Sequence, residues 1–237
     1  TNFPYLADFR RLARALAAAV WESSARGDWD AAVQTTLDGL HFSQDIARGG
    51  SGIHCLVSYA AEDTVLRSVL SRPTPRCDSA VPLRRLLAGV TALDPGRPSL
   101  AEALATDCAV ETAELERVFR GWRVGELVEA TGDHSVLGPV LLMFLNPTQA
   151  VQVLQDGYGE AIERCRRATY TPPKQTARAG IGALVASYLS YPVGMPRGWF
   201  SALAMRRIFT IMIALRIYQL EHGRYPDSLE ALVPGYL

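Results

Sequence analysis

Apolar residues recur every three or four positions along most of the chain, which is the spacing of one face of an α-helix. The first such stretch predicts a helix from about Tyr5 to Ser24. Gly27 and Asp28 then break the pattern, and a second helix is expected to begin at about Asp28. No stretch of useful length alternates between apolar and polar residues as a β-strand does. The sequence therefore predicts an all-α fold.

The same spacing predicts further helices over 53–70, 81–93, 100–120, 147–165 and 181–189. Glycine-rich or proline-rich segments separate them, and Ser99 and Pro147 are expected at helix starts. The run VLGPVLLMFL, residues 136–145, is too short and too interrupted to cross a bilayer. It is expected to form buried helix or extended core.

The last fifth of the chain carries the most distinctive pattern. From Trp199 a long helix is expected, with one apolar face made by the following residues: Trp199, Leu203, Ile208, Ile211, Met212, Leu215 and Tyr218. Phe200, Phe209, Ile213, Ile217 and Leu220 extend the apolar surface nearly all round, so burial on more than one side is expected. Three arginines interrupt the helix, and a transmembrane segment is therefore not predicted.

Dense turn signals follow this helix. Gly223 is expected to close it in the left-handed conformation, and Tyr225 beside Pro226 is expected to seal the turn against the helix. Asp227 and Glu230 have the spacing of a capping box, which predicts a short helix that ends before Pro234.

These elements are expected to form a single all-helical domain over residues 1–237, with a subdivision into 1–72, 73–197 and 198–237. The segment GDWDAAVQTTLDGL resembles the turn and second helix of a tetratricopeptide-like unit, but no second copy follows at a fixed period. The predicted architecture is therefore an irregular helical bundle, with tetratricopeptide-like hairpins packed around a long apolar C-terminal helix.

The C-terminal segment RYPDSLEALVPGYL, residues 224–237, resembles that of a group of uncharacterised all-helical proteins of the bacterial envelope, in which an RYPxSLxxLvPxYL run follows a helical body. It is similar, over about 30 residues, to the segment after the long helix in major pseudopilins of type II secretion. Both resemblances imply an extracytoplasmic location, and the first implies a membrane tether upstream of Thr1. Pseudopilins begin with a prepilin leader and an apolar helix, whereas this chain begins TNFPYLADFRRL.

Composition narrows the function classes. Twenty-four basic residues balance 24 acidic ones, and Lys174 is the only lysine. Zero net charge gives little electrostatic attraction to nucleic acid, so no nucleic-acid partner is expected. Cys55, Cys77, Cys108 and Cys165 form no CxxC pair, which argues against a zinc ribbon or a thioredoxin motif. Buried thiols are expected, although a Cys55–Cys77 disulfide stays open.

Few residues have the spacing of a catalytic or metal site. His41 and Asp45 lie one helical turn apart but lack a third ligand. His54 and Cys55 are adjacent, and adjacent side chains on a helix diverge by about 100 degrees, so they cannot act as base and nucleophile.

Two other places could hold chemistry. Asp133 and His134 lie in a predicted loop, TGDHS, where ordinary turn residues are the simpler interpretation. The acidic helix 100–120 places Asp107, Glu111 and Glu114 at helical spacing, but no ExxH motif accompanies them. No catalytic, cofactor or metal residue is assigned.

The sequence favours a non-enzymatic helical scaffold of the bacterial cell envelope that binds a protein partner. Two alternatives stay open: a pseudopilin-related component of a secretion system, and an enzyme with an unrecognised site near Asp133 and His134 or on the acidic helix. Neither the identity of the partner nor the oligomeric state follows from the sequence.

Overall fold

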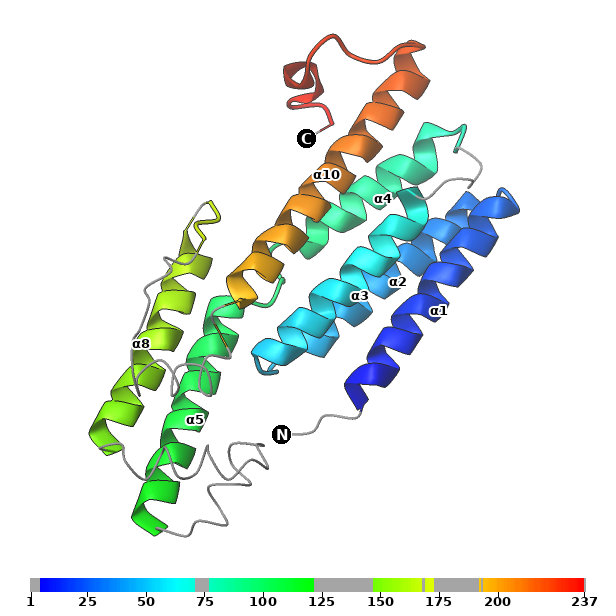
Figure 1. The fold of residues 1–237 in the computed structure, drawn as a ribbon. Helices are drawn as coiled ribbons and strands as arrows, with labels where there is room; N and C mark the ends of the chain where they lie inside the picture. The colour runs from blue at the N-terminus through cyan, green and yellow to red at the C-terminus, as the bar shows by residue number, and fades with distance from the viewer. Residues whose placement is uncertain are drawn as a thin grey trace. The chain divides into compact units, whose positions relative to one another are not determined.

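The structure is a computed structural model that describes residues 5–70, 77–121, 147–167, 169–172, 192 and 194–236. Within these ranges the regular elements are all helical, which confirms the all-α prediction (Figure 1). The predictions for VLGPVLLMFL, for Asp133 and His134, and for a helix over 181–189 lie outside the described residues. The helices are α1 (Tyr5–Ala25), α2 (Trp29–Ala47), α3 (Gly52–Leu70), α4 (Ala80–Leu93), α5 (Leu100–Gly121), α8 (Pro147–Arg166), α10 (Met195–His222) and the short 3-10 helix η1 (Leu229–Leu232).

The chain divides into two compact units. Unit 1 contains residues 1–3, 49–53 and 99–200, and its described helices α5 and α8 pack on one another. Unit 2 contains residues 4–48, 54–98 and 201–237, so it holds α1, α2, α4, most of α3 and the greater part of α10.

The helix boundaries in unit 2 follow from local chemistry. Asp28 caps α2, because its side chain accepts a hydrogen bond from the Ala31 N–H at 3.0 Å. Ser79 caps α4 in the same way through the Val81 N–H. α1 and α2 pack side by side, as the predicted helical hairpin requires.

Two predicted boundaries near the C-terminus are wrong. α10 begins at Met195, not at Trp199, because Pro196 is tolerated in the first helical turn. The predicted capping box at Asp227 does not form: η1 is preceded by Ser228 with no side-chain cap, and Asp227 instead pairs with Arg224 at 3.4 Å. The predicted short helix is therefore a 3-10 turn, which ends before Pro234 as expected.

The core of unit 2 lies where α2, α3, α4 and α10 meet. Its fully buried side chains include Leu40, Leu66, Leu86, Phe209 and Ile217. Small residues let the helices approach closely. A Cβ atom added at Gly39 would lie 2.9 Å from Val65 of α3, and one added at Gly89 would lie 2.5 Å from Leu37 of α2.

The buried face of α10 differs in part from the predicted one. Phe209, Ile213 and Ile217 face the core of unit 2, whereas Ile208 and Met212 are 50% and 45% exposed. The expectation that Ile208 and Met212 belong to the buried stripe is therefore wrong. Both faces have the three- and four-residue spacing of a helix, so the periodicity alone could not rank them.

The described residues bear on the state of the cysteines and on the apolar length of the helices. All four cysteines are free. Cys55, Cys77 and Cys165 are buried, which confirms the interpretation as buried thiols for these three, whereas Cys108 is half-buried. Among the helices that the structure describes, none combines the length and apolarity needed to cross a bilayer.

Candidate functional site

The two histidines singled out in the sequence, His41 and His54, lie in different surroundings. His41 and Asp45 are both exposed, and Asp45 pairs with Arg48 at 2.9 Å. His54 stacks on Tyr5 and lies 3.0 Å from its hydroxyl, while Cys55 is fully buried. The two adjacent residues therefore face different surroundings, as the helical geometry predicts.

The acidic helix α5 uses its carboxylates in different ways. Asp107 accepts a hydrogen bond at 2.8 Å from the Gly52 N–H at the start of α3, so it caps that helix. Burial raises the pKa of Glu111, and a hydrogen bond from the Tyr158 hydroxyl partly opposes that rise. Glu114 is exposed, and Arg117 lowers its pKa through a hydrogen bond. Across the described parts of the chain, no three His, Cys, Asp or Glu side chains gather as metal ligands would.

Unit 1 also has an open hollow of about 410 Å³ between the end of α5 and the start of α8. Its walls are mainly apolar, and it is lined by Glu116, Phe119, Arg120, Pro147, Thr148 and Val151. Glu116 and Arg120 lie 4.0 Å apart as an ion pair. The hollow does not bring together an acid, a base and a nucleophile.

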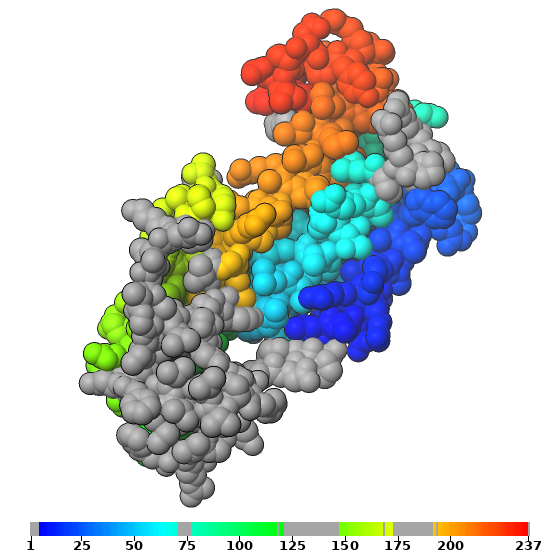
Figure 2. Space-filling view, viewed as in Figure 1, coloured from blue at the N-terminus to red at the C-terminus, as the bar shows by residue number. Residues whose placement is uncertain are grey.

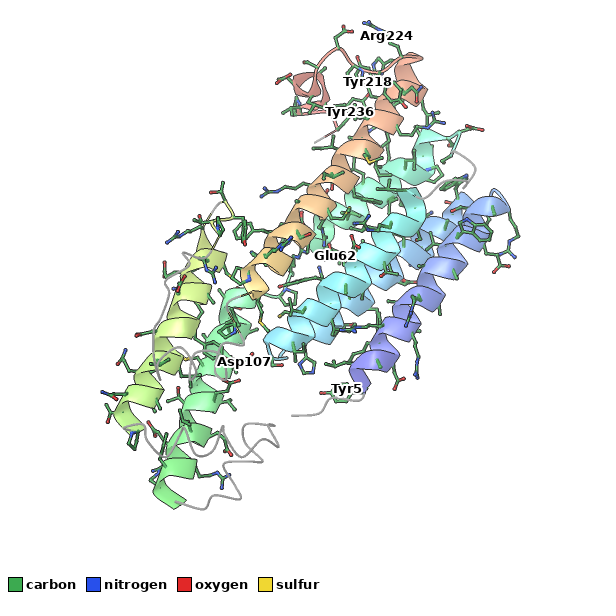
Figure 3. All side chains as sticks on the ribbon, in the orientation of Figure 1. Tyr5, Glu62, Asp107, Tyr218, Arg224 and Tyr236 are labelled. Atoms are coloured by element: carbon green, nitrogen blue, oxygen red, sulfur yellow. The ribbon has the colours of Figure 1, made fainter. Side chains whose placement is uncertain are left out.

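The most strongly organised polar group in the described structure is the Glu62 cluster, formed by Glu62, Asp94, Arg97 and Arg206 in unit 2. Glu62 lies in the middle of α3, facing α10 (Figure 3). Its Oε2 accepts from Arg97 Nη2 at 2.8 Å, and its Oε1 accepts from Arg206 Nη1 at 3.2 Å. The carboxylate therefore holds two guanidinium groups at once.

Further contacts fix the two arginines. Arg206 Nη2 donates to the Val90 carbonyl of α4 at 2.8 Å, and its Nε lies 2.8 Å from Asp94 Oδ1. The Arg97 guanidinium lies over the Tyr59 ring, 5.6 Å from the centroid. The cluster thus connects α3, α4, α10 and the segment after α4.

Three of the four side chains in the cluster are almost fully removed from solvent. The side chains of Glu62, Arg97 and Arg206 are 4%, 7% and 5% exposed, whereas Asp94 is 59% exposed. Burial lowers the pKa of Arg97, and the Glu62 carboxylate opposes that shift. Removing the counter-charge of Glu62, Arg97 or Arg206 would destabilise the fold, because a buried charge would then lack a partner.

The chemistry available to this cluster is limited. Arginine does not deprotonate in proteins, so it cannot serve as a general base. Both carboxylate oxygens of Glu62 are already engaged by guanidinium groups. The arrangement is therefore suited to fixing the position of α10 against α3 and α4.

Sequence reasoning missed the Glu62 cluster, although a signal for it exists. Glu62 lies on a stripe of α3 with the buried residues Cys55, Tyr59 and Leu66, and Arg206 lies on the stripe of α10 with Phe209. An acid within one apolar stripe and a base within another indicate a buried pair. The periodicity could not show that the two stripes meet.

Opposite the Glu62 cluster, α10 has a second apolar face, which we call the α10 outer face. It is defined by Ala204, Ile208, Ile211, Met212 and Leu215, each of them exposed or half-buried. Four of these residues, Ala204, Ile208, Ile211 and Leu215, follow the alternating four- and three-residue steps of a coiled-coil seam. In Figure 2 this part of α10, in orange, reaches the surface beside α3.

The C-terminal segment is fixed to the end of α10 by a group of exposed polar and aromatic residues. The Tyr236 hydroxyl donates to Glu221 at 2.6 Å, and Arg84 of α4 binds the same carboxylate through two nitrogens at 2.7 and 2.8 Å. These bonds lower the pKa of Glu221 to about 2. Tyr218 stacks on His222 and contacts Tyr236 (Figure 3).

Tyr225 does not seal the turn, contrary to expectation. Its side chain is 50% exposed, and Tyr236 makes the contact with the end of α10 instead. Gly223 has the predicted left-handed conformation, with φ of 74°, and its N–H donates to the Gln219 carbonyl at 2.9 Å.

Comparison of the chain with protein-family models, with curated proteins and with solved structures found no match.

Proposed function

We propose that this chain is a non-enzymatic helical scaffold that binds a protein partner at the bacterial cell envelope. The observation that carries the proposal is the α10 outer face. Half-exposed isoleucine and methionine side chains lie in a row on a helix that is otherwise firmly held in the core. A row of large apolar side chains at a surface is a common mark of a protein interaction site.

The Glu62 cluster supports the same proposal. Binding is tighter when the surface offered to a partner is already rigid, because less conformational entropy is lost on association. Arg206 on α10 and Arg97 after α4 both bind Glu62, and these buried contacts fix the face of α10 opposite the α10 outer face. The placement at the envelope rests on the resemblance of the C-terminal segment to the group of envelope proteins. The tetratricopeptide-like character of the first hairpin rests on its turn sequence and on the packing of α1 against α2.

Affinity capture from membrane extracts, combined with chemical cross-linking and mass spectrometry, tests the proposal. A stoichiometric protein partner is expected, cross-linked at defined positions on the helices. The full-length gene product would separate this scaffold from a pseudopilin-related component, since the latter requires a prepilin leader. Capture of the chain without any partner, or turnover of a metabolite by the purified chain, would overturn the proposal.

A further inference from the structure

The charge distribution of the chain narrows the kind of partner that the α10 outer face would bind. Although acidic and basic residues balance overall, no Asp or Glu occurs from Arg164 to Leu220. The basic residues of that stretch are Arg164, Arg166, Arg167, Lys174, Arg178, Arg197, Arg206, Arg207 and Arg216. α10 lies within it as far as Leu220. Of the arginines on this helix, Arg206 pairs with Glu62 and Asp94, and Arg216 pairs with Asp78, whereas no such pair is seen for Arg207 among the described residues.

The charge of Arg207, beside the α10 outer face, is positive. Arg207 is exposed and precedes Ile208, which places it at the edge of the seam. No ion pair joins Arg207 to another of the described residues. The single acid of α10, Glu221, is already held by Arg84 and Tyr236. The seam is therefore flanked by positive charge that nothing described on this helix offsets.

The shape of the apolar surface favours a helix as its occupant. The seam positions repeat in steps of four and three residues, which matches the narrow stripe that one helix presents to another. Met212 at its edge adds a flexible side chain that adapts to different partners. An opposing helix with apolar residues at the same spacing and acidic residues beside them would satisfy both the seam and Arg207.

We propose that the partner presents an acidic amphipathic helix, which packs lengthwise on the α10 outer face. This inference rests on the proposed scaffold function and specifies its binding surface. A second copy of the chain is a poorer occupant, because its α10 would bring arginines and a carboxylate that is already paired.

A displayed library of amphipathic peptides about four heptads long tests this inference with the intact chain as bait. The library carries leucine at the seam positions and either Glu or Lys at the flanking positions. Selection is expected to enrich peptides with Glu. The double variant Ile208→Asp/Met212→Asp is expected to weaken binding of an enriched peptide about tenfold or more, because a charge then opposes each apolar contact.

Matched variants separate the seam from general effects. Val81→Asp on α4 changes an apolar residue that is even more exposed than Ile208 and Met212, and it should leave peptide binding unchanged. Arg207→Glu should reverse the selection in favour of Lys peptides. Each variant is first shown by circular dichroism to melt like the parent chain.

Several outcomes would overturn the inference: enrichment of Lys peptides, enrichment without charge preference, no enrichment, or binding that survives the double variant. Binding to phosphatidylglycerol vesicles through the same residues, without peptide enrichment, would assign the face to lipid. Dimerisation abolished by the double variant would assign it to a second copy. Affinity capture with cross-linking distinguishes failure of this inference from failure of the proposed scaffold function. A protein partner that cross-links away from the α10 outer face would support the scaffold function and overturn this inference.

Discussion

Neutralising Glu62 should destabilise unit 2 strongly. In the variant Glu62→Gln the amide oxygen can still accept from one guanidinium, but the amide nitrogen then faces the other. The carboxylate at present takes two charge-assisted hydrogen bonds, from Arg97 and Arg206, with all three side chains at or below 7% exposure. Such bonds contribute about 1.5 to 3 kcal/mol each. Breaking a buried pair on one side costs about 3 to 5 kcal/mol, and we expect a loss in that range.

The measurements are urea unfolding, which gives the free energy of unfolding, and thermal melting, which gives Tm, both followed by far-UV circular dichroism. For a chain of this size a loss of about 3 to 5 kcal/mol corresponds to a fall in Tm of roughly 6 to 20 °C. Hydrogen exchange of the α3 and α10 amides should show the same change locally. Glu22→Gln is the matched control, because Glu22 pairs with Arg26 at 2.9 Å on the exposed surface of α1. That variant should change stability by less than about 0.5 kcal/mol.

A second arm tests whether the loss arises from uncompensated charge. The triple variant Glu62→Leu, Arg97→Met and Arg206→Met removes all three buried charges together. Apolar replacement of a buried ion cluster is often neutral or stabilising, so this variant should regain most of the stability that Glu62→Gln loses. If Glu62→Gln and Glu22→Gln lose equally little, the reasoning about buried charge is refuted.

Three further predictions concern single positions. Gly39→Ala should cost about 1 to 3 kcal/mol, because the added methyl group meets Val65 at 2.9 Å in a packed core; an unchanged urea midpoint would contradict this. The depressed pKa of Glu221 contributes stability that is present above about pH 4.5 and is lost as the pH falls toward 2. Tyr236→Phe should therefore raise the Glu221 pKa in an NMR titration and move acid unfolding to higher pH; identical titration curves would count against it. Gly223→Val should lower Tm by several degrees, because valine is strained at φ of 74°, and a superimposable melting curve would exclude that strain.

Local signals predicted the helices well where turn chemistry marked their ends. Asp28 and Ser99 lie at the starts of α2 and α5, and Gly223 closes α10, because each acts through its own backbone or the next few residues. The prediction failed where the answer depends on distant partners. Tyr225 and Tyr236 are both aromatic residues after α10, and only the return of the chain toward Arg84 and Glu221 selects Tyr236.

Which face of α10 is buried also depends on distant partners, and the Glu62 cluster gives a physical reason for the observed orientation. Both faces carry large apolar residues at helical spacing, so apolar burial alone discriminates poorly between them. Arg206 lies on the buried face, where it meets Glu62 of α3. If α10 turned its other face inward, Glu62 and Arg97 would keep each other, but Arg206 would leave and Ile208 would take its place beside the carboxylate. The buried cluster therefore favours one rotation of the helix, and that rotation leaves the α10 outer face exposed or half-buried.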